Sequence, residues 1–425
     1  MANYVIRGGK PLKGDISVSG SKNAALGVVA AAMLLDAPCV LENVPAIADI
    51  KVLVDVCRDL GAEIQFENNI LKVDPTKINT HRVENERSKQ IRASYYLQGA
   101  LLGRFAKAET FLPGGCNFGT RPFDLHIKGF EALGANYSRD NVHVYLEADK
   151  LVGTHIFFDR VSVGATINIM MAASKAEGVT TLENVAREPH VVEVANFLNN
   201  NGARIRGAGT DVIRIEGVHT LAGGPNYSII PDQIEAGTYM IAAAATKGDV
   251  TVRNLIPKHM EPLTAKLDEM GAGLEVGEDW IRVYMEGKEL QATTFRTHPY
   301  PGYPTDLHPQ TSVLLTQAKG VSYLHEMVWE NRFQYVDDLR LMGADINLSG
   351  NTATIPGPAK LTGAQVKARD LRAGAAMVVA GMVAEGQTEV VNVHTLERGY
   401  ERLISKLSNI GADIRIDGEE EDSEE

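Results

Sequence analysis

The chain has little cysteine. Three cysteines occur in 425 residues, at positions 39, 57 and 116. An odd number at wide spacing fits neither a disulfide framework nor the ligand spacing of a zinc site. We therefore expect a protein of a reducing, cytoplasmic compartment that needs no metal.

Long apolar runs are also missing, since no stretch approaches the ~18 apolar residues of a membrane span. Residues 1–20 alternate like a strand and lack the apolar core of a signal peptide. The net charge of −12 argues against a nucleic-acid partner, although part of it lies in the tail "DGEEEDSEE", which we expect to be disordered from about residue 418. No Walker or dinucleotide fingerprint is present, so we expect no ATP, NAD or other cofactor.

The chain does contain a repeat. The pair "GA" follows a helical pattern six times, with the glycines 68–73 residues apart at positions 61, 134, 202, 271, 343 and 411. Each of these amphipathic patterns stops at the glycine, which is the preferred residue of a left-handed helix cap. An alternating run, a turn and usually a second run follow, which predicts a hairpin.

A second, more apolar helix is expected upstream of each glycine, for example "KNAALGVVAAAMLL" from residue 22 and "RAGAAMVVAGMVA" from residue 372. Polar residues are sparse around most of these helices, which predicts burial on nearly every side. An apolar strand such as "VLENV" or "TTLENV" comes next. Each repeat thus reads as buried helix, strand, loop, amphipathic helix, glycine and hairpin.

Six such repeats predict two α/β domains of three repeats each, with the helices inside and the sheets outside. We expect the first domain to span residues 22–229. The second is expected over residues 230–425, and the pattern alone leaves open which half the opening strand joins.

The residues that depart from the repeat gather at two kinds of position. The starts of the buried helices carry Lys22, Asn23, Arg92, Arg160, Ser162, Gly164, Asp232, Glu235, Asp306, Asp370 and Arg372. The loops before the amphipathic helices carry Asp49, Cys116, Arg121, Glu188, Arg332 and Arg398. Helix starts favour anions, so a cation there calls for an anionic ligand. We expect both sets to face a cleft between the domains. Six of their cations could bind phosphates or carboxylates there, namely Lys22, Arg92, Arg121, Arg332, Arg372 and Arg398. The alternative is that each cation pairs with a neighbouring acid.

The stretch "LPGGCNFGTRPFDLH", residues 112–126, presents Cys116 after two glycines. A reactive thiol needs an exposed, electropositive setting, and Arg121 lies five residues further on. Cys39 and Cys57, by contrast, read as buried apolar residues. Asp306 could be either a helix N-cap or a general base, and His126 is expected to orient its loop or the following helix.

With "GSKNAA", this cysteine stretch, "SVGAT", "PTD", "ENRF", "DLRAG" and "ERGYER" in order, the chain resembles the UDP-N-acetylglucosamine 1-carboxyvinyltransferases of the enolpyruvyl transferase family over nearly its whole length. The resemblance implies two inside-out α/β domains of three repeats, with the active site in the interdomain cleft. It also assigns residues 1–21 to the second domain.

The resemblance further implies transfer of the enolpyruvyl group of phosphoenolpyruvate to the 3-hydroxyl of UDP-N-acetylglucosamine, through a tetrahedral ketal that loses phosphate. Cys116 matches the proton donor, which fosfomycin alkylates, and Asp306 matches the base. The phosphoenolpyruvate cations correspond to Lys22, Arg121 and Arg398, with Asn23 beside the reacting centre.

Positions that match contacts of the nucleotide sugar are Asn23, Arg92, Arg121, Pro122, Phe123, Asp124, Leu125, Arg160, Ser162, Val163, Gly164, Asp306 and Val328. Supporting charges are expected at Asp49, Glu188, Arg332, Asp370 and Arg372. Arg160 and Phe123 depart from the residues common in the family. The alternatives are a transferase acting on shikimate 3-phosphate and a catalytically silent homologue that binds UDP-sugars.

Overall fold

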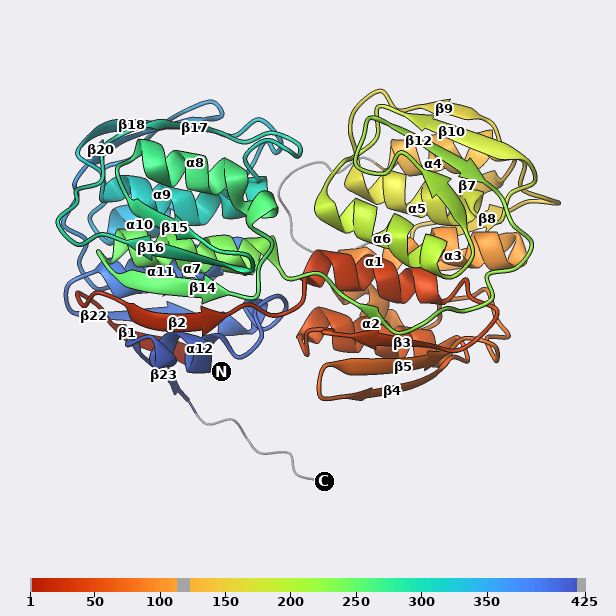
Figure 1. The fold of residues 1–425 in the computed structure, drawn as a ribbon, viewed down its shortest axis with the longest axis horizontal. Helices are drawn as coiled ribbons and strands as arrows, with labels where there is room; N and C mark the ends of the chain where they lie inside the picture. The colour runs from red at the N-terminus through yellow and green to blue at the C-terminus, as the bar shows by residue number, and fades with distance from the viewer. Residues whose placement is uncertain (1, 113–122, 419–425) are drawn as a thin grey trace. The chain divides into compact units, whose positions relative to one another are not determined.

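The computed structural model describes residues 2–112 and 123–418, and they fall into two compact units. The N-terminal unit is Gly20–Ile230, and the C-terminal unit combines Met1–Ser19 with Pro231–Glu425. Each unit has its own hydrophobic core. Within each unit the helices lie inside and the sheets lie outside, as the ribbon shows (Figure 1).

The N-terminal unit contains three repeats of the predicted form. The first consists of α1 (Lys22–Ala32), β3 (Cys39–Glu42), α2 (Ala48–Asp59), β4 (Glu63–Glu67) and β5 (Ile70–Asp74). The second consists of the 3-10 helices η1 (Glu86–Gln90) and η2 (Arg92–Tyr95), then α3 (Tyr96–Phe105), β6 (Lys107–Phe111), α4 (Asp124–Ala132), β7 (Asn136–Arg139) and β8 (His143–Glu147). The third consists of β9 (His155–Phe157), α5 (Val163–Ala173), β10 (Val179–Glu183), α6 (Pro189–Asn200), β11 (Arg204–Arg206), β12 (Val212–Glu216) and then β13 (Tyr227–Ser228).

The C-terminal unit begins with β1 (Asn3–Arg7) and β2 (Lys13–Ser17) and continues after the N-terminal unit with three more repeats. The fourth repeat consists of α7 (Gln233–Ala245), β14 (Asp249–Arg253), η3 (Pro257–Met260), α8 (Glu261–Glu269), β15 (Gly273–Val276) and β16 (Trp280–Tyr284). The fifth consists of β17 (Thr294–Arg296), η4 (Thr305–Leu307), α9 (His308–Thr316), β18 (Gly320–His325), α10 (Val336–Leu341), β19 (Asn347–Ser349) and β20 (Thr352–Gly357). The sixth consists of β21 (Gln365–Lys367), α11 (Leu371–Val383), β22 (Gln387–Val391), η5 (Val393–Thr395), α12 (Leu403–Asn409) and β23 (Asp413–Asp417).

The six glycines end their helices as predicted. All six have φ between 90° and 105°, the left-handed region in which a side chain is strained. Upstream of them, α5, α7 and α11 are buried along almost every residue. The inside-out α/β repeat architecture predicted from the sequence is therefore confirmed.

The sheets contain one feature that the repeat pattern did not show. Short strands enter five of the six sheets as parallel edge strands, namely β2, β9, β13, β17 and β21. Most of them have only two or three residues, too few to show a period of two in the sequence. In the sheet of the sixth repeat, β1 lies between β22 and β23, where the other repeats have a second hairpin strand, in the order β21-β22-β1-β23.

Candidate functional site

Three of the expected site residues, Cys116, Arg121 and Pro122, lie outside the described residues, as does the acidic tail from residue 419. The remaining residues lie mostly at the N-terminal ends of helices.

Lys22 begins α1 behind Ser21, whose hydroxyl accepts a hydrogen bond from the Ala24 amide. The Lys22 ammonium lies 2.8 Å from a carboxylate oxygen of Asp49, in the first turn of α2. Both side chains are almost fully buried, 11% and 5% exposed. Lys22 therefore already has an anionic partner, which is the alternative that the sequence left open for each cation. Asn23, the next residue, is half-buried.

Arg92 lies beside three rings that we call the aromatic cluster: Tyr95, Phe123 and His126. The rings of Phe123 and His126 are stacked with centroids 4.3 Å apart, and Tyr95 meets His126 edge-on at 5.0 Å. The Arg92 guanidinium lies 5.8 Å from the Tyr95 ring centroid. Tyr95 was not singled out in the sequence, although its place between Arg92 and a buried helix could have marked it.

His126 is held as a neutral ring. Burial, and then the charge of Arg92, lower the pKa of His126 to about 3. The amide nitrogen of Asn168, on α5, is 3.1 Å from His126 Nδ1 and also donates to the Tyr95 carbonyl. These contacts join His126, in the first turn of α4, to α5, and its role in orienting that helix stays a prediction.

The N-terminus of α5 closes on the same cluster. A Cβ at Gly164 would lie 2.5 Å from the Tyr95 hydroxyl and 3.1 Å from His126 Nε2, so a side chain there would displace these groups. Ser162 caps the helix by accepting from the Ala165 amide, and Val163 is its first residue.

The first turn of α4 carries the other expected sugar contacts. Leu125 is buried, whereas Asp124 is exposed and lies 2.5 Å from the guanidinium of Arg160. Glu188 precedes α6, and its charge acts on Tyr96 at the start of α3, as does that of Arg92. The structure thus brings together the starts of α3, α4 and α5, with Glu188 nearby.

In the C-terminal unit, Asp306 lies in the 3-10 helix η4, whose N-cap is Pro304. Its carboxylate accepts from Arg372 Nη2 at 3.0 Å and Nε at 3.2 Å, and lies 3.4 Å from Arg332 Nη2. Both arginine side chains are buried, while Asp306 is 31% exposed. The sequence left open whether Asp306 is an N-cap or a base. The geometry favours a carboxylate that is partly exposed to solvent over an N-cap.

Arg372 is fixed from both ends. Asp370 caps α11 and accepts from the Arg372 and Ala373 amides. At the other end, the guanidinium lies 5.6 Å from the Tyr400 ring centroid. Burial alone would lower the pKa of Arg372, but Asp306 and other neighbours outweigh it and raise that pKa. Arg398, two residues before Tyr400, is half-buried in the turn between η5 and α12.

Val328 lies in the segment that follows β18 and is half-buried. Its amide donates to Glu326 Oε1 at 2.7 Å, and the hydroxyl of Thr305, next to Asp306, donates to Glu326 Oε2 at 2.9 Å. Sequence reasoning missed Glu326. The signal was an acidic residue directly after an apolar strand, which is weak without knowledge of its burial.

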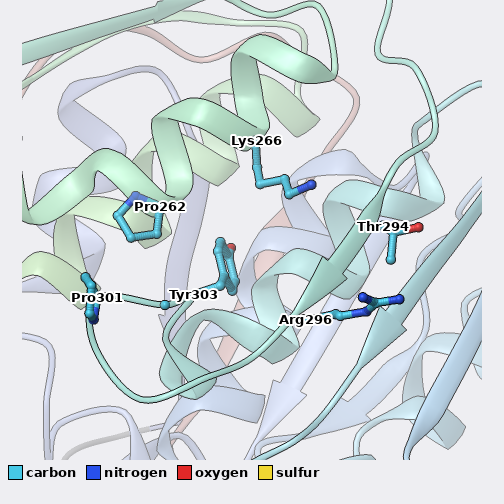
Figure 2. A pocket seen from close by; sticks show the side chains of 7 residues that line it. Pro262, Lys266, Thr294, Arg296, Pro301 and Tyr303 are labelled. Carbon is cyan, nitrogen blue, oxygen red and sulfur yellow. The ribbon is translucent and has the colours of Figure 1, made fainter.

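Elsewhere in the C-terminal unit, a surface cavity of about 450 Å³ contains none of the predicted residues. Lys266, Thr294 and Arg296 lie along one side of it and two prolines along the other, with Tyr303 between them (Figure 2). Among the residues that the structure describes, no group of three His, Cys, Asp or Glu side chains could hold a metal ion. No helix within 2–112 and 123–418 has the length and apolar character that a membrane crossing requires.

Comparisons with known proteins cover nearly the whole chain. The model of the EPSP synthase (3-phosphoshikimate 1-carboxyvinyltransferase) family matches residues 6–407. UDP-N-acetylglucosamine 1-carboxyvinyltransferase 3 of Caldanaerobacter subterraneus subsp. tengcongensis is 53% identical over 414 residues, which are 97% of this chain and 99% of that protein. The UDP-N-acetylglucosamine 1-carboxyvinyltransferase of Halothermothrix orenii is also 53% identical, over 98% of this chain and 99% of its own.

Solved structures show the same fold. The enolpyruvyl transferase NikO from Streptomyces tendae superposes with a TM-score of 0.89 at 27% identity, covering 98% of this chain and 99% of its own. EPSP synthase from Acinetobacter baumannii reaches 0.72 at 18% identity, covering 98% and 100%, and supports the fold alone. The resemblance drawn from the motifs is confirmed: the chain is an enzyme of the carboxyvinyl transferase class and belongs to the family of the UDP-N-acetylglucosamine 1-carboxyvinyltransferases.

Proposed function

We propose that this protein transfers the enolpyruvyl group of phosphoenolpyruvate to the 3-hydroxyl of UDP-N-acetylglucosamine and releases phosphate. The observation that carries the proposal is the agreement of two independent findings. Two relatives named UDP-N-acetylglucosamine 1-carboxyvinyltransferase are each 53% identical to this chain over nearly its full length. The described residues that match the family's motifs also form ordered charged groups at helix ends.

The reaction divides into an addition and an elimination. In the addition, the sugar 3-hydroxyl oxygen bonds to C2 of phosphoenolpyruvate while the C3 methylene takes up a proton and becomes a methyl group. In the elimination, a proton leaves that methyl group, the double bond re-forms, and the C2–O bond to phosphate breaks. Protons and electron pairs balance without a redox partner or a metal.

Asp306 is the residue we propose as the base for the 3-hydroxyl. A base has to reach its proton within hydrogen-bonding distance, and the carboxylate is the partly exposed member of its group. Two buried guanidinium groups, those of Arg332 and Arg372, restrict its orientation.

Lys22, Arg121 and Arg398 are the cations we propose for phosphoenolpyruvate, and Cys116 the acid that protonates its methylene. Lys22 is held against Asp49 at 2.8 Å, so the ammonium is already oriented before any ligand binds. A preorganised cation adds more transition-state stabilisation than one that must first be ordered. The roles of Cys116, Arg121 and Arg398 rest on the family motif.

The contacts that we propose for the nucleotide sugar are Asn23, Arg92, the segment 121–125, Arg160, the start of α5, Asp306 and Val328. The aromatic cluster, which includes Phe123 of this segment, offers flat apolar faces and a neutral imidazole. Asp49, Glu188, Asp370 and Arg372 are proposed to support these charges. On this proposal the reaction is the first committed step of peptidoglycan synthesis and takes place in the cytoplasm.

The experiment is a substrate comparison. Phosphate release from phosphoenolpyruvate is measured with UDP-N-acetylglucosamine and, separately, with shikimate 3-phosphate, and the products are identified by mass spectrometry. We expect release and an enolpyruvyl product with the nucleotide sugar alone. Turnover with shikimate 3-phosphate instead would support the sister activity, and turnover with neither would support the silent homologue.

A further inference from the structure

Glu326 is a buried carboxylate immediately after β18, and only 2% of it is exposed. It accepts four hydrogen bonds. Three end on Oε1, from the Thr297 hydroxyl at 2.8 Å and from the Val328 and Trp329 amides at 2.7 and 3.0 Å. The fourth comes to Oε2 from the Thr305 hydroxyl at 2.9 Å. One side chain therefore links the end of β17, the 3-10 helix η4 and the segment 327–329.

The donors are neutral groups. The His308 ring approaches Glu326 Oε2 to 4.0 Å, but burial together with the Arg332 charge lowers the pKa of His308 well below its usual value. Burial of a carboxylate is costly, and an apolar residue of similar size often stabilises a fold equally well. Glu326 offsets that cost by accepting from successive backbone amides, as an anion does in a backbone nest.

Two of these bonds end at positions that the proposed function uses. Val328 is itself an expected contact of the nucleotide sugar, and its amide is bound by Glu326. Thr305 directly precedes Asp306, and its carbonyl also accepts from Arg332 at 3.3 Å. In the segment 327–329, the Met327 amide also donates to the Thr297 hydroxyl at 2.9 Å.

We propose that Glu326 is a positioning residue that fixes the Val328 backbone and the Thr305–Asp306 turn for the nucleotide sugar. It acts through these neighbours and does not touch the reacting atoms. The inference rests on the proposed function and adds a specificity role that is selective for one of the two substrates. None of the cations expected for phosphoenolpyruvate is among the hydrogen-bond partners of Glu326 that the structure describes, so the binding of that substrate should depend on Glu326 little.

The test uses variants that break one bond at a time in the full chain. In Glu326→Gln the Oε1 atom can keep its three donors, but the amide nitrogen that replaces Oε2 only donates, so the bond from Thr305 to a charged carboxylate is lost and only a weaker, reversed bond between neutral groups can replace it. Thr305→Val removes the same bond from the other side, and Thr305→Ser restores it. The matched control is Asp249→Asn, which loses a carboxylate bound to Arg282 on a different sheet of the same unit.

Steady-state phosphate release is measured with each substrate varied in turn. For Glu326→Gln and Thr305→Val we expect kcat/KM for UDP-N-acetylglucosamine to fall about 10-fold, the usual effect of losing one hydrogen bond to a charged group. The KM for phosphoenolpyruvate should change less than about 2-fold, since uniform loss of binding to one substrate leaves the other unaffected. The double variant should be no worse than either single one, because both remove the same bond.

Thr305→Ser and Asp249→Asn should keep the wild-type constants. The inference is overturned if the variants lose thermal stability while kcat and both KM values of the folded fraction stay unchanged. It is also overturned if the KM for phosphoenolpyruvate rises as much as the KM for UDP-N-acetylglucosamine. Thr305→Val and Thr305→Ser give this answer even if Glu326→Gln does not fold. An inactive wild-type protein would overturn the proposed function and this inference together, whereas an active wild type with insensitive variants overturns this inference alone.

Discussion

Replacing Asp306 by asparagine removes the negative charge between two buried guanidinium groups while keeping the shape of the side chain. The side chains of Arg332 and Arg372 are only 1% and 4% exposed. Loss of one partner from a fully buried ion pair costs about 3–5 kcal/mol of unfolding free energy. Since Asp306 is 31% exposed, water screens part of the repulsion that remains, and we expect a loss of about 2 kcal/mol.

This loss should be visible in thermal unfolding followed by calorimetry. In a unit of about 200 residues, 2 kcal/mol lowers the midpoint by about 4–8 °C. The matched control is again Asp249→Asn: Asp249 is 33% exposed and binds Arg282, whose side chain is 36% exposed. Because that arginine reaches solvent after its partner is lost, we expect a clearly smaller shift.

Equal shifts for the two asparagine variants would refute the reasoning, since burial of the arginines would then make no difference. An unchanged midpoint for Asp306→Asn would show that the Asp306 contacts contribute nothing to stability. The same variant, assayed below its midpoint, should also lose phosphate release, because an amide cannot act as the base.

Three further predictions follow from burial. Fosfomycin should alkylate Cys116 alone, because burial raises the pKa of Cys39 and Cys57 to about 12 and leaves only about 1 in 30,000 of those thiols ionised at pH 7.5. Peptide mass spectrometry that shows an adduct on Cys39 or Cys57 would contradict this. Gly164→Ala should lower the unfolding free energy by about 1–3 kcal/mol in denaturant titration, because the new methyl group meets the aromatic cluster, and a neutral result would contradict that contact. Burial raises the pKa of Glu193 to about 7, so the folded protein loses stability as pH rises from about 4.5 through 7 and this carboxyl group ionises. The unfolding free energy of Glu193→Gln should therefore rise relative to that of the wild type by up to about 3 kcal/mol between pH 4.5 and 8, and a pH-independent difference would be inconsistent with this shift.

Much of the fold could be predicted from the sequence, because its signals are local. A glycine with positive φ ends each amphipathic helix, and nearly uniform apolar composition marks helices such as α5 and α11. The short parallel edge strands could not be predicted. The two residues of β13 are ordered by pairing with β3, which lies some 185 residues earlier in the chain.

The candidate site divides in the same way. Residue types at helix starts singled out Lys22, Arg372 and Asp306 as candidates, but gave no indication of their partners. The bond between Lys22 and Asp49 joins two helices, and its formation depends on how these helices pack. Glu326 is harder still, because its burial and its four donors come from segments that only the folded sheet brings together.

The measurement that tests the central claim most directly is phosphate release from phosphoenolpyruvate by the purified full chain. We predict release with UDP-N-acetylglucosamine, formation of its enolpyruvyl ether, and none with shikimate 3-phosphate. Absence of release with the nucleotide sugar, under conditions in which calorimetry shows the protein to be folded, would contradict the account.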